Sequence, residues 1–158
     1  MIDKIDKQEA IAALDELMAQ NLKRLETSLE DTRNRARDAP GGNQSHSDTS
    51  KVQLSTVALG LEAQVIELGS IREGLQFVKT KASSDSVLVG SLFTVQNGSG
   101  DVDTYLLLSK ARGDSVSVRG VEVTSISTAS PVGKVFLNRK RGERVFFRDV
   151  EFTVIDVV

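Results

Sequence analysis

Two stripes of apolar residues with helical spacing run along the first half of the chain. The first stripe advances in steps of three or four residues, which keeps its members on one face of a helix, and consists of Leu14, Met18, Leu22, Leu25 and Leu29. The second stripe repeats this pattern with Leu54, Ala58, Leu61, Val65, Leu68 and Leu75, and Ile71 replaces the interrupting Arg72. The spacing predicts one helix from about Lys7 to Arg37 and another from about Ser50 to Lys79.

Neither stripe can be buried by its own helix, so we expect the two helices to pack against each other. The connection between them is short, which makes the pair antiparallel. At a rise of 1.5 Å per residue each helix would be roughly 40 to 45 Å long. A two-helix finger of that length suggests either an oligomerisation device or a probe that enters another molecule.

The second half of the chain has runs of strand length separated by turn-rich segments. The runs cover residues 87–95, 105–108, 116–118, 121–126, 144–147 and 152–157. Between the fourth and fifth runs, Ser130 is a good helix N-cap, and Pro131 lacks only an N–H that the first helical turn leaves unused. The predicted class is therefore α+β: an antiparallel two-helix coiled-coil hairpin, then a small, mostly antiparallel β domain with one short helix.

The distribution of aromatic residues supports a division of the chain near residue 80. Every aromatic residue lies at Phe77 or beyond, and a two-helix seam, unlike a compact core, can be built from aliphatic residues alone. We therefore expect a coiled-coil arm over residues 1–80, with its tip at about residues 38–50. A second domain is expected over residues 81–158.

Composition excludes several classes of function. The 20 basic and 22 acidic residues give a net charge of −2, which does not indicate a globally basic nucleic-acid binder. The absence of cysteine excludes disulfides and thiol catalysis and fits a reducing cytoplasm. No apolar run approaches the roughly 18 residues of a membrane span. With one histidine and no nucleophile–base constellation, we do not expect the isolated chain to be an enzyme.

The segment SISTASPVGKVFLNRKRGERVFF, residues 125–147, resembles the Gre family of bacterial transcript-cleavage factors. The family shows a strand, a Ser-Pro-hydrophobic-Gly start of a short helix, a basic turn, a Gly-acidic pair and a final pair of strands. The residues that match are Ser130, Pro131, Val132, Gly133, Lys134, Leu137, Lys140, Gly142, Glu143 and Val145. The long hairpin and the total length also fit the family.

The resemblance implies that the C-terminal domain has an FKBP-like fold and docks at the rim of the RNA polymerase secondary channel. The residues assigned to docking are Ser130, Pro131, Gly133, Lys134, Arg139, Lys140 and Arg141. It also implies that the arm enters the channel of the polymerase core as part of a monomer and has no cofactor of its own. In the family, two acids at the tip help hold a second magnesium ion at the polymerase active site, where the ion activates the water that cleaves backtracked RNA.

At the tip the sequence departs from the family. Cleaving members read approximately Gly-Asp-Leu-Ser-Glu-Asn, whereas this chain reads GGNQSHSDTSKV and has one acid, Asp48, between residues 39 and 51. Asp38 lies ten residues earlier and does not match the spacing. His46 is a poor magnesium ligand because magnesium prefers oxygen. Asp48 is therefore either a weak metal-facing group or, like Ser50, only a helix N-cap.

Two groups of basic residues have alternative interpretations. Arg33 and Arg37 lie on one face of the first helix near the tip, where they would either face the transcript RNA or complement the helix dipole. The cluster Lys134, Arg139, Lys140, Arg141, Arg144 and Arg148 would either be a solvated face or meet an acidic polymerase surface or nucleic acid.

The leading hypothesis is a Gre-type regulator that occupies the polymerase channel without efficient transcript cleavage. A second hypothesis keeps cleavage, with Asp48 as ligand and Asp38 assisting. A third, a prolyl isomerase or chaperone module, rests on the FKBP-like fold alone, and fold does not confer function. A fourth, a coiled-coil dimer module, is disfavoured because the hairpin satisfies its own seam.

Overall fold

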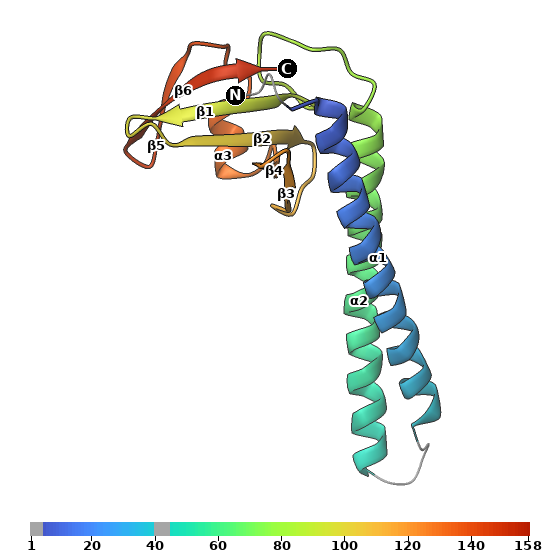
Figure 1. Ribbon diagram of the computed structural model, residues 1–158. Helices are drawn as coiled ribbons and strands as arrows, with labels where there is room; N and C mark the ends of the chain where they lie inside the picture. The colour runs from blue at the N-terminus through green and yellow to red at the C-terminus, as the bar shows by residue number, and fades with distance from the viewer. Residues whose placement is uncertain (1–4, 40–44) are drawn as a thin grey trace. The chain divides into compact units, whose positions relative to one another are not determined.

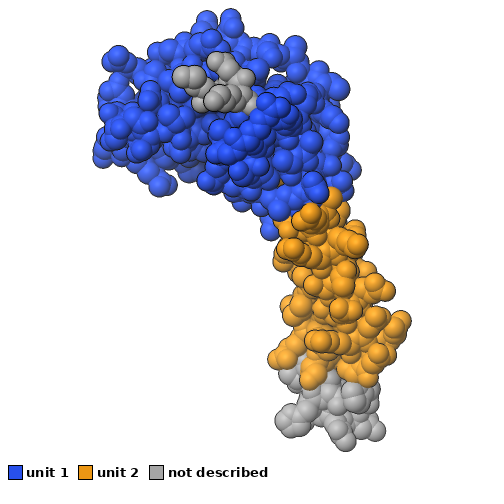
Figure 2. Space-filling model, viewed as in Figure 1, with its two compact units in different colours: residues 1–17, 71–158 blue, residues 18–70 orange. Residues whose placement is uncertain are grey.

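The computed structural model describes residues 5–39 and 45–158, without the side chains of residues 45–49 (Figure 1). The chain forms two compact units (Figure 2). One unit combines residues 1–17 with residues 71–158, and the other consists of residues 18–70. The ends of the hairpin nearest the sheet therefore belong to the same unit as the sheet.

Two long helices form the hairpin that the apolar stripes predict. Helix α1 covers Lys7–Asp38, within a residue of the predicted range. Helix α2 covers Ser45–Val78 and begins five residues before the predicted start at Ser50. Asp48 and Ser50 therefore lie inside α2, and the prediction that one of them caps the helix from outside is wrong.

Within each unit the two helices are antiparallel neighbours. In the sheet-containing unit Leu14, Ile71 and Leu75 are buried, and the Gln8 side chain donates a hydrogen bond to the Lys79 carbonyl at 2.6 Å. In the other unit the buried side chains include Met18, Leu29, Ala58 and Leu68. Ile71 faces inward, as predicted, while the neighbouring Arg72 pairs with Asp15 at 2.8 Å.

The Asp15–Arg72 pair couples hairpin stability to pH. The pKa of Asp15 is held below its ordinary value, chiefly by the hydrogen bond from Arg72. Because the folded-state pKa is depressed, the stabilisation is present above the unfolded-state pKa and lost as pH falls through the folded-state value. We expect Asp15→Asn to lower the free energy of unfolding by about 1 kcal/mol at pH 7 and to have less effect at an acidic pH below the folded-state pKa of Asp15.

Urea unfolding of the wild type and Asp15→Asn at both pH values would measure this difference. The exposed neighbour Glu16 provides the matched control, Glu16→Gln. An equal destabilisation by Asp15→Asn at neutral and acidic pH would contradict a role for the carboxylate charge.

The C-terminal part of the chain forms a six-stranded mixed sheet with the order β3-β4-β2-β1-β6-β5. The strands are β1 Leu92–Asn97, β2 Val102–Leu108, β3 Ser115–Val118, β4 Val121–Ser127, β5 Arg144–Phe147 and β6 Val150–Val157. A short helix, α3, covers Pro131–Phe136, which confirms the helix predicted from Ser130 and Pro131. The α+β class is as predicted.

The sheet is mostly antiparallel, as predicted, and the start of its first strand is corrected. Among the described strands every pairing is antiparallel except that of β2 with β4, which is parallel. The first strand begins at Leu92 rather than residue 87, because Gly90 adopts a left-handed conformation with φ +96° and turns the chain. Val87 instead pairs with the loop after α3, accepting a hydrogen bond from Asn138 N–H and donating one to the Arg139 carbonyl, both at 2.8 Å.

The core of the sheet-containing unit lies between α3 and one face of the sheet. Phe136 of α3 is 2% exposed, and its ring lies 5.6 Å from that of Phe93 on β1 and 6.0 Å from that of Phe152 on β6. Val95, Leu107 and Val154 complete the same buried cluster. These contacts fix α3 on the sheet, since a helix of six residues is not stable alone.

Helix α2 is unusually apolar for a helix that is mostly exposed. An 18-residue window within Ser50–Val78 has the length and composition of a membrane-crossing segment, although only 17% of that window is buried in the structure. The expectation that no apolar run approaches the length of a membrane span is therefore wrong for α2. Length and composition alone do not make this helix a membrane span.

Candidate interaction site

The start of α3 is built from the Ser-Pro-hydrophobic-Gly motif. The Ser130 backbone is extended, and its hydroxyl accepts a hydrogen bond from the Gly133 N–H at 3.0 Å. The same hydroxyl donates to the Ser127 carbonyl oxygen at 2.7 Å. Pro131 is the first helical residue and is exposed. The motif thus presents a proline next to a helix start whose polar groups are satisfied.

Gly133 is required by close approach of the backbone. It is buried, and a Cβ at this position would overlap the Ser127 carbonyl oxygen and lie 2.9 Å from the Ser127 carbonyl carbon. Real Cβ atoms essentially never come so close to backbone atoms. The glycine therefore sets how closely α3 follows the end of β4.

Exposed basic residues surround α3 and the turn after it. Lys134 lies on the exposed side of α3, and Arg139 turns back so that its Nε donates to the Val135 carbonyl at 3.2 Å. Arg141 pairs with Asp156, and Arg144 pairs with Glu151 at 3.6 Å. Among the described residues, Lys134 and Lys140 form no ion pair.

The loop before β5 is held by hydrogen bonds that order its backbone. The Lys140 N–H donates to the Glu143 carboxylate at 2.5 Å, and Gly142, with φ +89°, donates its N–H to the Val154 carbonyl at 2.7 Å. Arg148 and Asp149 both have positive φ, as a two-residue hairpin turn requires. Of the predicted docking residues, the structure therefore brings Ser130, Pro131, Gly133, Lys134 and residues 139–141 onto α3 and the loop that follows it.

Phe146 is an exposed aromatic residue that the sequence analysis did not single out. It lies on the edge strand β5 and is 71% exposed. Val145 is buried in the same cluster as Phe136 of α3, so the alternation along β5 turns Phe146 toward the other face of the sheet. An exposed aromatic side chain is typical of protein–protein contact surfaces.

The predicted arm residues that the structure describes lie along α1, in the unit of residues 18–70. Arg33 pairs with Glu62 of α2 at 3.3 Å, and Arg37 donates a hydrogen bond to the Asn34 side chain at 2.7 Å. Asp38 ends α1, with its carboxylate 3.9 Å from the Arg37 guanidinium and 77% of its side chain exposed. The side chains of His46 and Asp48 lie outside the described residues. Among the groups that are described, no cluster of His, Asp or Glu could hold a metal ion.

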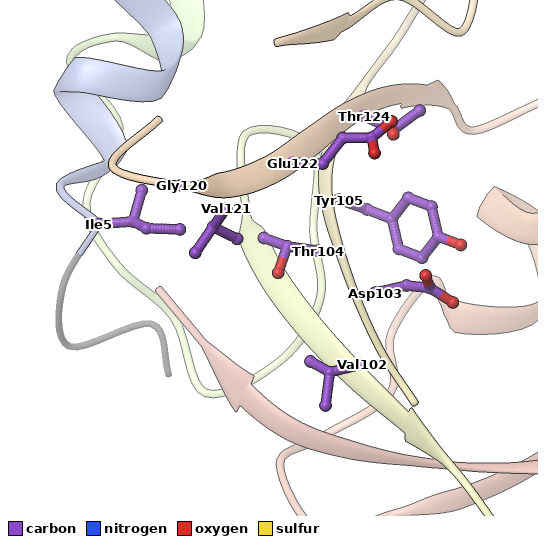
Figure 3. A pocket seen from close by; sticks show the side chains of 9 residues that line it. All are labelled: Ile5, Val102, Asp103, Thr104, Tyr105, Gly120, Val121, Glu122 and Thr124. Carbon is purple, nitrogen blue, oxygen red and sulfur yellow. The ribbon is translucent and has the colours of Figure 1, made fainter. Parts of the chain in front are cut away.

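A polar pocket of about 390 Å³ lies in the sheet-containing unit beside β2 and β4 (Figure 3). Tyr105 and Asp103 extend in the same direction from β2, and burial, followed by the nearby Asp103 charge, raises the pKa of Tyr105. Tyr105 is the single aromatic side chain among the residues lining this pocket. A prolyl-isomerase pocket would need a floor of aromatic side chains. Phe93 and Phe136, the candidates for such a floor, lie instead in the buried core. This pocket gives no support to a prolyl isomerase.

The fold and the α3 surface define an α+β protein with an N-terminal two-helix hairpin, a mixed six-stranded sheet and a short capped helix with exposed basic residues nearby. The chain matches no protein-family model and no curated protein. It is similar to solved structures of Gre-factor homologues. One is GreA factor homolog 1 (Gfh1) of Thermus thermophilus, with 18% identity over 91% of this chain and 94% of that one.

Two further solved structures give the same result. A structure described as the transcription factor Gfh1 has 20% identity over 92% of this chain and 93% of its own. Gfh1 of Thermus aquaticus has 15% identity over 90% and 92%, and the TM-score is 0.37 for all three structures. At these identities and TM-scores the similarity adds no weight to an argument about function, which has to come from the residues of this chain.

Proposed function

We propose that this chain is a Gre-type transcription factor that binds RNA polymerase at its secondary channel and modulates elongation without stimulating efficient transcript cleavage. The observation that carries the proposal is the α3 surface. There the family motif forms a capped helix start at Ser130–Gly133, next to exposed cations. Lys134 and Lys140 make no ion pair with a described residue, so they are available to an acidic partner.

The proposed division of labour places the chemistry in the polymerase. The hairpin end would enter the channel, Arg33 and Arg37 would lie near the transcript, and any magnesium would be held by the polymerase. One acid near the tip, Asp48, supplies fewer ligand oxygens than the family pair, so we propose that the second metal is not recruited efficiently. The protein would act in the cytoplasm and bind the polymerase core as a monomer.

RNA cleavage in a purified, stalled and backtracked elongation complex tests this proposal. We expect no cleavage above the polymerase's own rate, the same result for Asp48→Ala, and suppression of an added cleaving Gre factor. Cleavage that depends on Asp48 would instead show that one acid suffices. If neither cleavage nor suppression occurred at concentrations well above that of the competitor, the assignment to polymerase would be wrong.

Docking is tested separately from the tip with Lys134→Glu/Lys140→Glu. Because these two lysines make no ion pairs with described residues, the double variant should fold like the wild type. Its suppression of the competitor should weaken at least tenfold. As a matched control, Lys23→Glu/Lys79→Glu makes the same change of charge at exposed positions outside α3 and away from the tip.

A further inference from the structure

Helix α2 has a second apolar face that the hairpin leaves uncovered. Its large members, Val52, Leu59 and Ile66, are 65%, 67% and 67% exposed. They alternate with the small residues Thr56, Ala63 and Ser70. The whole series, residues 52–70, advances in alternating steps of four and three, which is the heptad spacing of a coiled-coil seam. Leu54, Leu61 and Leu68, which face the hairpin, lie on the opposite side of α2.

The charges around this face restrict what could cover it. Between Lys51 and Arg72 the chain has no basic residue and only two acids, Glu62 and Glu67. Glu62 is already paired with Arg33 at 3.3 Å. Nucleic acid is excluded as a partner of this face because it requires cations. A membrane-spanning position is disfavoured, since α1 carries exposed charges alongside α2, and these are costly in lipid.

We propose that a second copy of this chain covers this face, with the two α2 helices antiparallel. In an antiparallel coiled coil the two seam positions of the heptad meet each other across the interface. Leu59 of one copy would then meet Ala63 of the other, Ile66 would meet Thr56, and Val52 would meet Ser70. Each large side chain faces a small one, so the face is complementary to itself around a two-fold axis.

A parallel pair has neither advantage. It would stack Leu59 on Leu59 and Ala63 on Ala63, leaving alternate layers overfilled and underfilled. It would also set Glu62 beside Glu67 of the other copy, two like charges. In the antiparallel pair the two Glu62 residues lie near the two-fold axis. Each of them is paired with Arg33 of its own copy, which compensates its charge.

The size of the face predicts a weak dimer. Residues 52–70 extend about 27 Å along the helix. A seam of that length buries an area at or below the roughly 1,200 Å² that specific interfaces bury. We therefore expect a dissociation constant in the range of about 10–100 μM. This proposal departs from the expectation, drawn from the family resemblance, that the protein is a monomer.

Sedimentation velocity across a concentration series tests for the dimer. The wild type should shift from the monomer mass toward twice that mass, and Leu59→Glu should raise the dissociation constant at least tenfold. Val57→Glu is the matched control, because Val57 is 52% exposed on the same helix but lies off this face. It should change the constant less than about twofold. Circular dichroism would establish that both variants keep the wild-type helix content.

Cysteine cross-linking tests the orientation, because the natural chain has no cysteine. When Val52→Cys and Ser70→Cys are mixed and oxidised, an antiparallel pair forms mainly the mixed disulfide. A parallel pair would form the two homodisulfides instead and would overturn the orientation. A wild type that stays monomeric to about 0.5 mM would overturn the proposal. So would binding to phosphatidylcholine vesicles that is lost in Leu59→Glu but kept in Val57→Glu.

Discussion

Two acids introduced at the tip, Asn43→Asp and His46→Glu, should convert this protein into a factor that stimulates transcript cleavage about 100-fold or more over the wild type. The two positions are three residues apart and follow Gly42, so the variant reads Gly-Asp-Gln-Ser-Glu, close to the tip pattern of cleaving Gre factors. A second metal ion contributes several kcal/mol by activating water and neutralising the phosphate. Lowering the activation free energy by about 2.7 kcal/mol already corresponds to a 100-fold increase in rate.

The measurement is the rate of RNA shortening in a backtracked complex at saturating factor. The neutral variant Asn43→Gln/His46→Gln controls for the loss of the native side chains. Each acid alone should give much less than the pair, because one carboxylate supplies fewer ligands for magnesium. If the double-acid variant suppressed a competing factor but still failed to cleave, the missing acids would not be the reason for inactivity.

Gly133→Ala should lower the free energy of unfolding by about 2–4 kcal/mol. The added methyl group would overlap the Ser127 carbonyl, which belongs to the backbone and cannot rotate away like a side chain. Relief of the overlap would move α3 and with it Phe136, the aromatic centre of the core. We therefore expect weaker polymerase binding as well as lower stability.

Gly74→Ala provides the matched control. Gly74 lies in α2 of the same unit, and a Cβ there meets nothing within 4 Å. Alanine favours helix more than glycine does, so this substitution should stabilise the protein by about 0.5–1 kcal/mol. Denaturant unfolding of both variants compares the same chemical change with opposite expected signs. A destabilisation by Gly133→Ala of less than about 0.5 kcal/mol would show that the α3 start adapts.

The helices were predictable where local chemistry determines them. The apolar spacing of α1 fixed its extent to within a residue, and Ser130 with Pro131 located the start of α3. The predicted start of the first strand, residue 87, was wrong. Residues 87–95 have a strand-like composition throughout, and the strand begins only at Leu92 because Gly90 adopts a left-handed conformation and turns the chain. The parallel pairing of β2 with β4 joins distant segments, which local patterns do not encode.

The candidate site was predictable only as a set of residue types. The motif named Ser130, Pro131 and Gly133, but the reason for Gly133, the overlap with Ser127, requires the fold. Two exposed apolar features were missed. The second face of α2 was missed because one stripe per helix was enough to explain the hairpin, and Phe146 because it follows only from the alternation along residues 144–147. The tip residues His46 and Asp48 remain predictions from sequence alone.

The order of strands in the sheet has a consequence for the protein during its synthesis. Strand β1 is completed on one side by β6, so that Phe93 pairs with Val157, near the end of the chain. The hairpin unit, residues 18–70, is local in sequence and can fold as soon as it leaves the ribosome. The sheet, in contrast, stays incomplete until β6 has been synthesised. In the interval Phe93 on β1 lacks its β6 partner, and chaperones should recognise the nascent protein at this unfinished strand.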